Sequence, residues 1–235
     1  MRRYNQYCPI VRASEILAER WTLVIVRNIL LGCRTFTEIE RGAPGISKTL
    51  LAQRLKGLAR FGIIQRVSNG QGRGHRYEPT ASGRELWDVC ESIGTWGARW
   101  LEVAPEHLDP YVVLWSMCNS LRTELIPDRR IVVRFDFSDL KRKSRFWLVL
   151  ERREGEVCLK HPGFDEDLFV TADSEWFAKW HMGWVPWSQA VRAGRIKVEG
   201  PRDLARAFHS WDGLSHFAAV KPAIGVVLAA ATARE

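Results

Sequence analysis

Hydrophobic residues recur at helical spacing through the N-terminal part of the chain, in segments separated by glycines and capping residues. The pattern predicts one helix over about 10–18 and a second over 20–31. The second is apolar nearly all round, as expected of a buried central helix. A short third helix is predicted to start at Thr37, where Thr37 and Glu40 fit a capping box.

The fourth predicted helix has two different faces. Ser47 can cap its first turn, and Gly62 ends it just after Phe61. Apolar positions point inward and polar positions outward, with Leu51, Leu55 and Leu58 on the inner face and Thr49, Gln53, Lys56 and Arg60 on the outer face. A short helix, a glycine turn and a second helix with a basic outer stripe are typical of a helix-turn-helix.

A hairpin is predicted directly after these helices, with strands over 63–67 and 75–78. Its loop, SNGQGRGHRY, alternates glycine with basic residues, so its backbone can approach a phosphate closely while Arg73 and Arg76 neutralise charge. A dinucleotide-binding loop is excluded, because no helix starts after Gly74 to receive a pyrophosphate. A hairpin in this position is the wing of a winged helix.

A fifth helix is predicted over about 81–101, with Thr80 at its start. It carries two apolar stripes, formed by Leu86, Val89, Ile93, Trp96 and Trp100 and by Trp87, Cys90 and Leu101. One small domain cannot bury both stripes. The excess apolar surface of this helix either packs on the second half of the chain or forms the seam of a dimer, and we favour the dimer.

The pattern changes after residue 104, where strands and helices alternate in an order typical of an antiparallel α+β domain. We therefore expect an α+β chain of two domains, 1–104 and 105–235. The elements predicted in the second domain are helices over 110–126, 174–182, 186–193 and from 201, and strands over 130–137, 146–152, 157–161, 168–172 and 195–199, with a Glu-Gly-Glu turn between the second and third strands.

Charge adds a candidate partner to this picture. The chain of 235 residues has a formal net charge of +8, and nine basic residues but two acidic ones lie between Arg34 and Arg76. Such a local excess of positive charge is typical of a surface that binds a polyanion.

Other composition features exclude several classes of protein. The sequence contains no run of 18 apolar residues and no apolar segment behind Arg2 and Arg3, so neither a membrane span nor a signal peptide is expected. The five cysteines are scattered without a CxxC pair, which favours a reducing cytoplasm over a disulfide framework. The six histidines show no metal-ligand spacing, and no nucleophile–base set is readable, so we expect no metal, no cofactor and no enzyme.

The first half resembles the HxlR-type winged-helix transcription regulators over residues 5–101. The motifs that carry the resemblance occur in order and at the family's spacing: Cys8-Pro9, Arg20-Trp21-Thr22, Leu30-Leu31-Gly32, Phe36-x-Glu38-Ile39, Pro44-Gly45-Ile46-Ser47, Arg54-Leu55 and Gly62-Ile63-Ile64. The resemblance implies a dimeric repressor or activator that places one winged helix on each half-site of a double-stranded DNA operator.

The second half resembles the sterol-carrier-protein-like fold over about 107–217. The string Ala193-Gly194-Arg195-Ile196-x-Val198-x-Gly200-Pro201 is its most characteristic part. The resemblance implies an apolar cavity between sheet and helices that holds a hydrophobic small molecule. Seven of the eleven tryptophans lie in this half, either as plain core or as a ligand wall, and the candidates for the wall are Trp147, Trp176, Trp180, Trp184 and Trp187.

Phosphate neutralisation supplies most of the affinity for DNA, and base edges in the major groove supply specificity. Gln53 can pair with adenine, and Lys56 can reach guanine or phosphate. Arg54 either contacts DNA or pairs with a neighbouring acid, and both alternatives stay open. The candidate DNA-binding residues are Arg34, Thr37, Ser47, Lys48, Thr49, Gln53, Arg54, Lys56, Arg73, His75 and Arg76.

Cys8 offers a rival form of regulation. Some HxlR-type regulators sense oxidants or electrophiles through this cysteine, and nearby Arg2, Arg3 and Arg12 favour a thiolate. In that alternative the second domain binds no ligand and serves only for dimerisation. A small buried cysteine that packs the N-terminal helix is the simpler interpretation.

Overall fold

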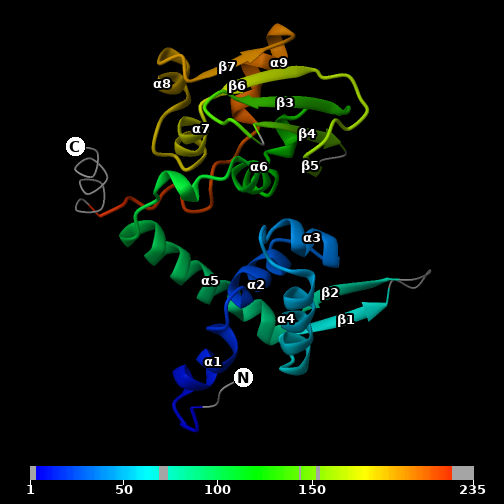
Figure 1. Ribbon diagram of the computed structural model, residues 1–235, viewed down its shortest axis with the longest axis vertical. Coiled ribbons are helices and arrows are strands. Elements are labelled where there is room, and N and C mark those ends of the chain that lie inside the picture. Colours follow the sequence, from blue (N-terminus) through cyan, green and yellow to red (C-terminus); the bar gives the residue numbers. More distant parts are fainter. Residues whose placement is uncertain (1–3, 69–73, 143, 152–153, 224–235) are drawn as a thin grey trace. The chain divides into compact units, whose positions relative to one another are not determined.

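The computed structural model describes residues 4–68, 74–142, 144–151 and 154–223 of the chain (Figure 1). They divide into two compact units, the first ending at Gly94 and the second beginning at Thr95, so the division falls inside helix α5 (Ala81–Trp100). The domain boundary predicted at 104/105 lies further along the chain and stays a prediction. None of the helices in the described part is long and apolar enough to cross a membrane.

The first unit contains the predicted helices and hairpin in the predicted order. The elements are α1 (Pro9–Leu17), α2 (Thr22–Leu30), α3 (Phe36–Arg41), α4 (Lys48–Arg60), β1 (Ile64–Ser68), β2 (His75–Pro79) and then α5. Its core is formed by the apolar faces of α2 and α4, where Ile25, Ile29, Leu51, Leu55 and Leu58 are all buried. The predicted inner face of the fourth helix is thereby confirmed.

Thr35, not Thr37, caps helix α3. The hydroxyl of Thr35 accepts a hydrogen bond from the backbone N–H of Glu38 at 3.2 Å, and the Glu38 carboxylate accepts one from the backbone N–H of Thr35 at 3.1 Å. Both threonines fit the capping-box pattern with a glutamate three residues later. The earlier pair is used because Glu38 also accepts from the backbone N–H of Arg34 at 2.6 Å, which satisfies a second donor before the helix.

The second unit combines a five-stranded sheet with helices, as Figure 1 shows. Its regular elements are α6 (Pro110–Cys118), β3 (Ile131–Phe137), β4 (Arg145–Glu151), β5 (Glu154–Cys158), β6 (Leu168–Ala172), α7 (Ser174–His181), α8 (Trp187–Arg192), β7 (Ile196–Glu199) and α9 (Arg202–Ala207). Short 3-10 helices are η1 (Pro105–His107), η2 (Thr123–Leu125) and η3 (Phe208–Ser210).

The sheet is mixed, so the predicted antiparallel sheet is wrong. Its strand order is β5-β4-β3-β6-β7, and β3 pairs with β6 in parallel, with Phe135 opposite Val170. The reason is the connection 159–167, which returns the chain past β4 and β3 before β6 begins. Strand β6 therefore runs in the direction of β3, while the other three pairs are antiparallel.

Two further predictions in this unit are wrong, and both concern the contact between the end of α6 and strand β5. The helix predicted over 110–126 ends at Cys118, and the predicted Glu-Gly-Glu turn lies inside β5. A Cβ atom on Gly155 would lie 2.7 Å from Leu121 Cδ1 and 3.1 Å from the Cys118 sulfur. The glycine therefore lets the end of α6 pack directly on the strand, a use of glycine that resembles a turn signal in the sequence.

One face of this sheet and the helices enclose a core of aromatic rings. The fully buried aromatic side chains are Phe135, Phe137, Phe177, Phe208 and Trp211. Their rings pack edge to face, tilted or stacked. Phe135 and Phe177, for example, pack edge to face with centroids 5.5 Å apart, and Phe135 and Phe137 are stacked. The opposite face of the sheet is more polar and carries the ion pair between Arg134 and Asp136. The space between sheet and helices is thus occupied by the unit's own side chains.

Candidate nucleic-acid interface

The start of α4 presents capped, exposed polar residues. The Ser47 hydroxyl accepts a hydrogen bond from the backbone N–H of Leu50 at 3.2 Å, as predicted for a helix cap. Lys48 and Thr49 follow it and are exposed. The first turn of a helix carries partial positive charge and free N–H groups, so this end of α4 favours an anion such as a phosphate.

The outward face of α4 continues with exposed Gln53 and Lys56. Among the residues that the structure describes, Lys48 and Lys56 form no ion pair. Both cations are therefore available to a partner, and Gln53 offers an amide that can donate and accept at once. The predicted outer face is exposed, and the roles of its residues on DNA stay predictions.

Arg54 pairs with a neighbouring acidic residue in the first unit, the second of its two predicted alternatives. Its guanidinium lies 2.8 Å from the Glu19 carboxylate and donates to the backbone carbonyl of Arg20 at 3.0 Å. These contacts fasten α4 to the segment between α1 and α2. A DNA contact by Arg54 would have to compete with the Glu19 pair.

Two other residues that we predict to contact the DNA backbone, Arg34 and Thr37, lie in the α2–α3 connection and in the first turn of α3. The guanidinium of Arg34 donates to the carbonyl of Ile29 at the end of α2, and Thr37 is exposed in the first turn of α3. Burial raises the pKa of Glu38, but hydrogen bonds from Arg34 and Thr35 outweigh it, and the net pKa lies below its ordinary value. Glu38 thus stays ionised and keeps the capping box intact.

The wing is an antiparallel hairpin of β1 and β2, with Val67 opposite Arg76. His75 and Arg76 are exposed at the start of β2. Arg73 lies outside the described residues, so its predicted contact is a statement about sequence alone. The backbone N–H of Tyr77 donates to the Arg34 carbonyl at 2.7 Å, which ties the hairpin to the α2–α3 connection.

The cysteines differ in their surroundings. Cys8 precedes α1 and is half-buried. Burial raises the pKa of Cys33 to about 11 and that of Cys118 to about 12, so these two thiols resist forming the reactive thiolate. A redox role of Cys8 stays a prediction.

The structure does not bring the five candidate tryptophans together. Trp180 is 3% exposed and packs in the core on Trp187, whose ring centroid lies 4.7 Å away. Trp147 lies on the opposite face of the sheet, where its indole N–H donates to Glu166 at 3.1 Å. Trp176 lies beside Arg195, and Trp184 is 38% exposed. Trp147 therefore cannot share one ligand wall with the others.

A buried polar cluster, which no motif in the sequence indicates, joins three segments of the second unit. His181 Nδ1 lies 2.8 Å from the Asp212 carboxylate, and His181 Nε2 lies 3.0 Å from the Ser116 hydroxyl. The hydroxyl of Ser120 also donates to Asp212 at 2.9 Å. The histidine and the aspartate are 3% and 2% exposed, so the cluster acts as an internal tie between α6, α7 and the C-terminal segment.

Comparison with known proteins identifies the first unit. The HxlR-like helix-turn-helix family model matches residues 16–105, which contain α2 to α5 and the wing. The transcriptional regulator YvaP of Bacillus subtilis is 33% identical over 107 residues, which are 45% of this chain and 97% of YvaP. The regulator MT3179 of Mycobacterium tuberculosis is 31% identical over 115 residues, 43% of this chain and 72% of MT3179.

A solved structure adds a similar match. The reduced form of the transcriptional regulator YodB from B. subtilis shares 30% identity, with a TM-score of 0.35, over 39% of this chain and 92% of YodB. YvaP and MT3179 are transcriptional regulators, not enzymes. By its helix-turn-helix and by its matches to YvaP and MT3179, the chain belongs to the HxlR family of DNA-binding transcriptional regulators.

Proposed function

We propose that the protein acts as a homodimer in which α4 of each copy enters the major groove of an operator and each wing contacts the flanking backbone. The observation that carries this proposal is the outward face of α4. Its capped start and its lysines without an ion-pair partner among the described residues form a continuous exposed surface, from Ser47 to Lys56. Such a surface carries positive charge that can neutralise DNA phosphates, together with polar groups that can hydrogen-bond to base edges.

Specific roles follow from position on this surface. Ser47, Lys48 and Thr49 lie at the positive end of the helix and contact phosphate. Gln53, nearer the middle of α4, reads an adenine, and Lys56 reaches guanine or phosphate. In the wing, Arg73, His75 and Arg76 bind the backbone or the minor groove. Arg34 and Thr37, at the start of α3, contact the phosphate backbone of the DNA.

Dimerisation through α5 is supported by a stripe of exposed apolar side chains. Val89, Ile93, Trp96 and Trp100 recur at helical spacing and are between 37% and 56% exposed. Large apolar side chains at this density on one helix face are unfavourable in water and are typical of an interface. A second copy presenting the same stripe would cover them.

Replacing Ile93 with glutamate is expected to convert the dimer into a monomer. A carboxylate buried in an apolar seam loses hydration without a partner, so the dimer dissociation constant should rise by about 100-fold or more. Affinity for a two-half-site operator should fall, while binding to a single half-site should be retained. Sedimentation velocity and fluorescence anisotropy measure the two effects.

The matched control is Thr95→Glu, which adds the same charge on the other side of α5. It should leave the oligomeric state unchanged. A dimer that survives Ile93→Glu at micromolar concentration would place the seam elsewhere.

A hydrophobic effector of the second unit is a further part of this proposal. Support comes from the half-buried Trp176 and Trp187 and the exposed Trp184, which lie on or between α7 and α8. An apolar molecule would bind beside these rings, since the interior is filled by the unit's own aromatic side chains. Binding would change DNA affinity only if one arrangement of the dimer binds the molecule better than another.

A further inference from the structure

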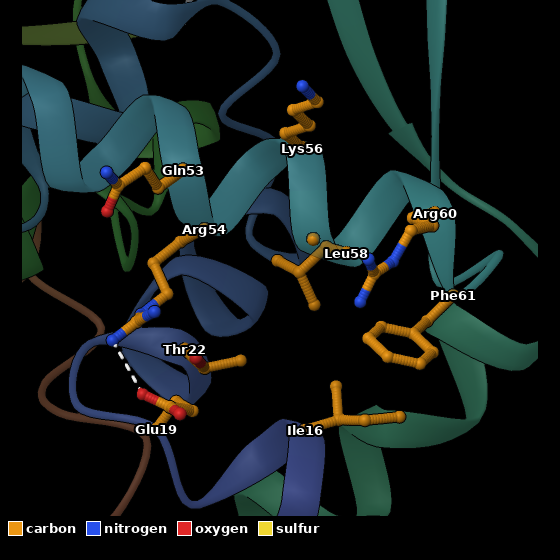
Figure 2. A pocket seen from close by; sticks show the side chains of 10 residues that line it. Ile16, Glu19, Thr22, Gln53, Arg54, Lys56, Leu58, Arg60 and Phe61 are labelled. Atoms are coloured by element: carbon orange, nitrogen blue, oxygen red, sulfur yellow. Dashed lines mark hydrogen bonds and ion pairs between the residues drawn. The ribbon is translucent and has the colours of Figure 1, made fainter. Parts of the chain in front are cut away.

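A pocket of about 270 Å³ lies in the first unit, on the side of α4 next to α1 and α2 (Figure 2). One wall is apolar and is formed by Ile16, Leu58 and Phe61. Gly57 leaves this wall open, because a Cβ atom added there would meet nothing within 4 Å. The volume and the apolar wall suit a molecule with a phenyl ring or a short alkyl chain.

Thr22 gives the pocket an unused polar group. It is the first residue of α2 and is 2% exposed, and within the described part of the chain its hydroxyl has no hydrogen-bond partner. Buried hydroxyls are nearly always hydrogen-bonded, so a buried one without a partner beside a pocket points to a bound molecule that supplies it.

The end of α2 at this pocket is also uncapped. Its N-cap residue is Trp21, which has a left-handed backbone with φ 76° and makes no side-chain cap hydrogen bond. Helix α2 has nine residues, its positive end lies at Thr22, and its first turn contains no acidic residue. This end favours an anionic group on the bound molecule.

A cationic side chain completes the pocket. Lys56 and Arg60 both belong to the lining, but Figure 2 shows only the Arg60 side chain turned into the space between Leu58 and Phe61, whereas the Lys56 side chain points away from it. The Arg60 guanidinium lies 5.0 Å from the centroid of the Phe61 ring. The pocket's carboxylate, Glu19, is already paired with Arg54. The pocket thus presents positive charge at one side of an apolar wall.

We propose that this pocket binds a small organic carboxylate whose apolar body packs against Ile16, Leu58 and Phe61. The carboxylate accepts hydrogen bonds from the Thr22 hydroxyl and the Arg60 guanidinium. Gln53 and Lys56 line the same pocket and also belong to the outward face of α4. A bound anion beside α4 lowers the positive potential of this face and with it DNA affinity, a consequence that rests on the proposed DNA contact by α4.

Isothermal titration of the full chain with phenylacetate, 4-phenylbutyrate and octanoate tests the pocket without DNA. At least one carboxylate should bind saturably, and its neutral amide should bind at least about tenfold more weakly. The variant Gly57→Leu fills the pocket and should abolish binding, while far-UV circular dichroism shows that the fold is kept. Failure of all three carboxylates to bind, or equal binding by Gly57→Leu, overturns the proposal.

Two substitutions locate the anion. Arg60→Gln should weaken binding about tenfold, whereas Arg66→Gln, on exposed strand β1, should leave it unchanged. Thr22→Val keeps the shape of the side chain, so it should weaken binding several-fold without lowering the thermal midpoint. A lowered thermal midpoint with unchanged binding would show that the Thr22 hydroxyl stabilises the fold and does not bind the carboxylate.

Protein concentration provides a separate test. Binding that vanishes as protein concentration rises would show that a second copy covers the pocket, and would also overturn the proposal.

Anisotropy with labelled duplex DNA then separates this inference from the proposed function. If the carboxylate binds the free protein and lowers DNA affinity, both stand. If it binds and leaves DNA affinity unchanged, the site stands and the coupling to α4 is wrong.

Discussion

Replacing Gly83 with alanine is expected to destabilise the first unit by about 3 kcal/mol or more. Gly83 lies in the first turn of α5, where a Cβ atom would lie 2.0 Å from the backbone carbonyl oxygen of Ile63. The same carbonyl accepts hydrogen bonds from the backbone and the hydroxyl of Thr80 at 3.1 and 3.0 Å. Backbone atoms held this firmly cannot move aside cheaply, so α5 and the wing must separate.

Gly57→Ala is the matched control, since it makes the same change in another helix. A Cβ atom there meets nothing within 4 Å, so the gain in helix propensity should raise stability by about 0.5–1 kcal/mol. Urea unfolding followed by far-UV circular dichroism measures both variants. Equal effects of the two substitutions would contradict the close contact between α5 and the strand that leads into the wing.

Asp212→Ala is expected to destabilise the second unit by about 3–5 kcal/mol. The carboxylate accepts from His181, from the Ser120 hydroxyl and from the backbone N–H of Leu214 at 3.0 Å. All three donors would lose their partner in a site that water reaches poorly. Urea unfolding followed by tryptophan emission, to which buried Trp211 beside Asp212 contributes, measures the loss.

Two milder substitutions in the same cluster should destabilise the second unit less than Asp212→Ala does. Asp212→Asn keeps one acceptor oxygen and should cost less than the alanine variant. Ser116→Ala removes one hydrogen bond to His181 from a half-buried position and should cost about 1 kcal/mol. A loss below about 1 kcal/mol for Asp212→Ala would show that the cluster does not tie the segments together.

Local patterns in the sequence predict the first unit well, because its elements are helices with clear apolar faces and caps. The Ser47 cap and the inward leucines of α4 depend only on neighbours within the same helix. The pattern places the capping box of α3 two residues late because two threonine–glutamate pairs fit it equally. Only the hydrogen bonds of Glu38 distinguish them.

Features that depend on long-range contacts could not be predicted in this way. Gly155 looks like a turn residue until the end of α6 is seen to pack on it. The parallel pairing of β3 with β6 depends on the path of a connection, which has no local signature. Ser116, His181 and Asp212 are far apart along the chain, and the pocket at Thr22 forms only where α1, α2 and α4 meet.

The salt dependence of DNA binding tests the central claim, that the outward face of α4 and the wing neutralise phosphates. Anisotropy of the full chain with a labelled duplex should be measured over a range of KCl concentrations. The variants Lys56→Ala and Arg76→Ala should bind more weakly, with a log–log salt slope shallower by about one for each phosphate that is no longer neutralised. Lys141→Ala, in the second unit, should match the unsubstituted protein. Slopes and affinities unchanged in both α4 and wing variants would contradict the account.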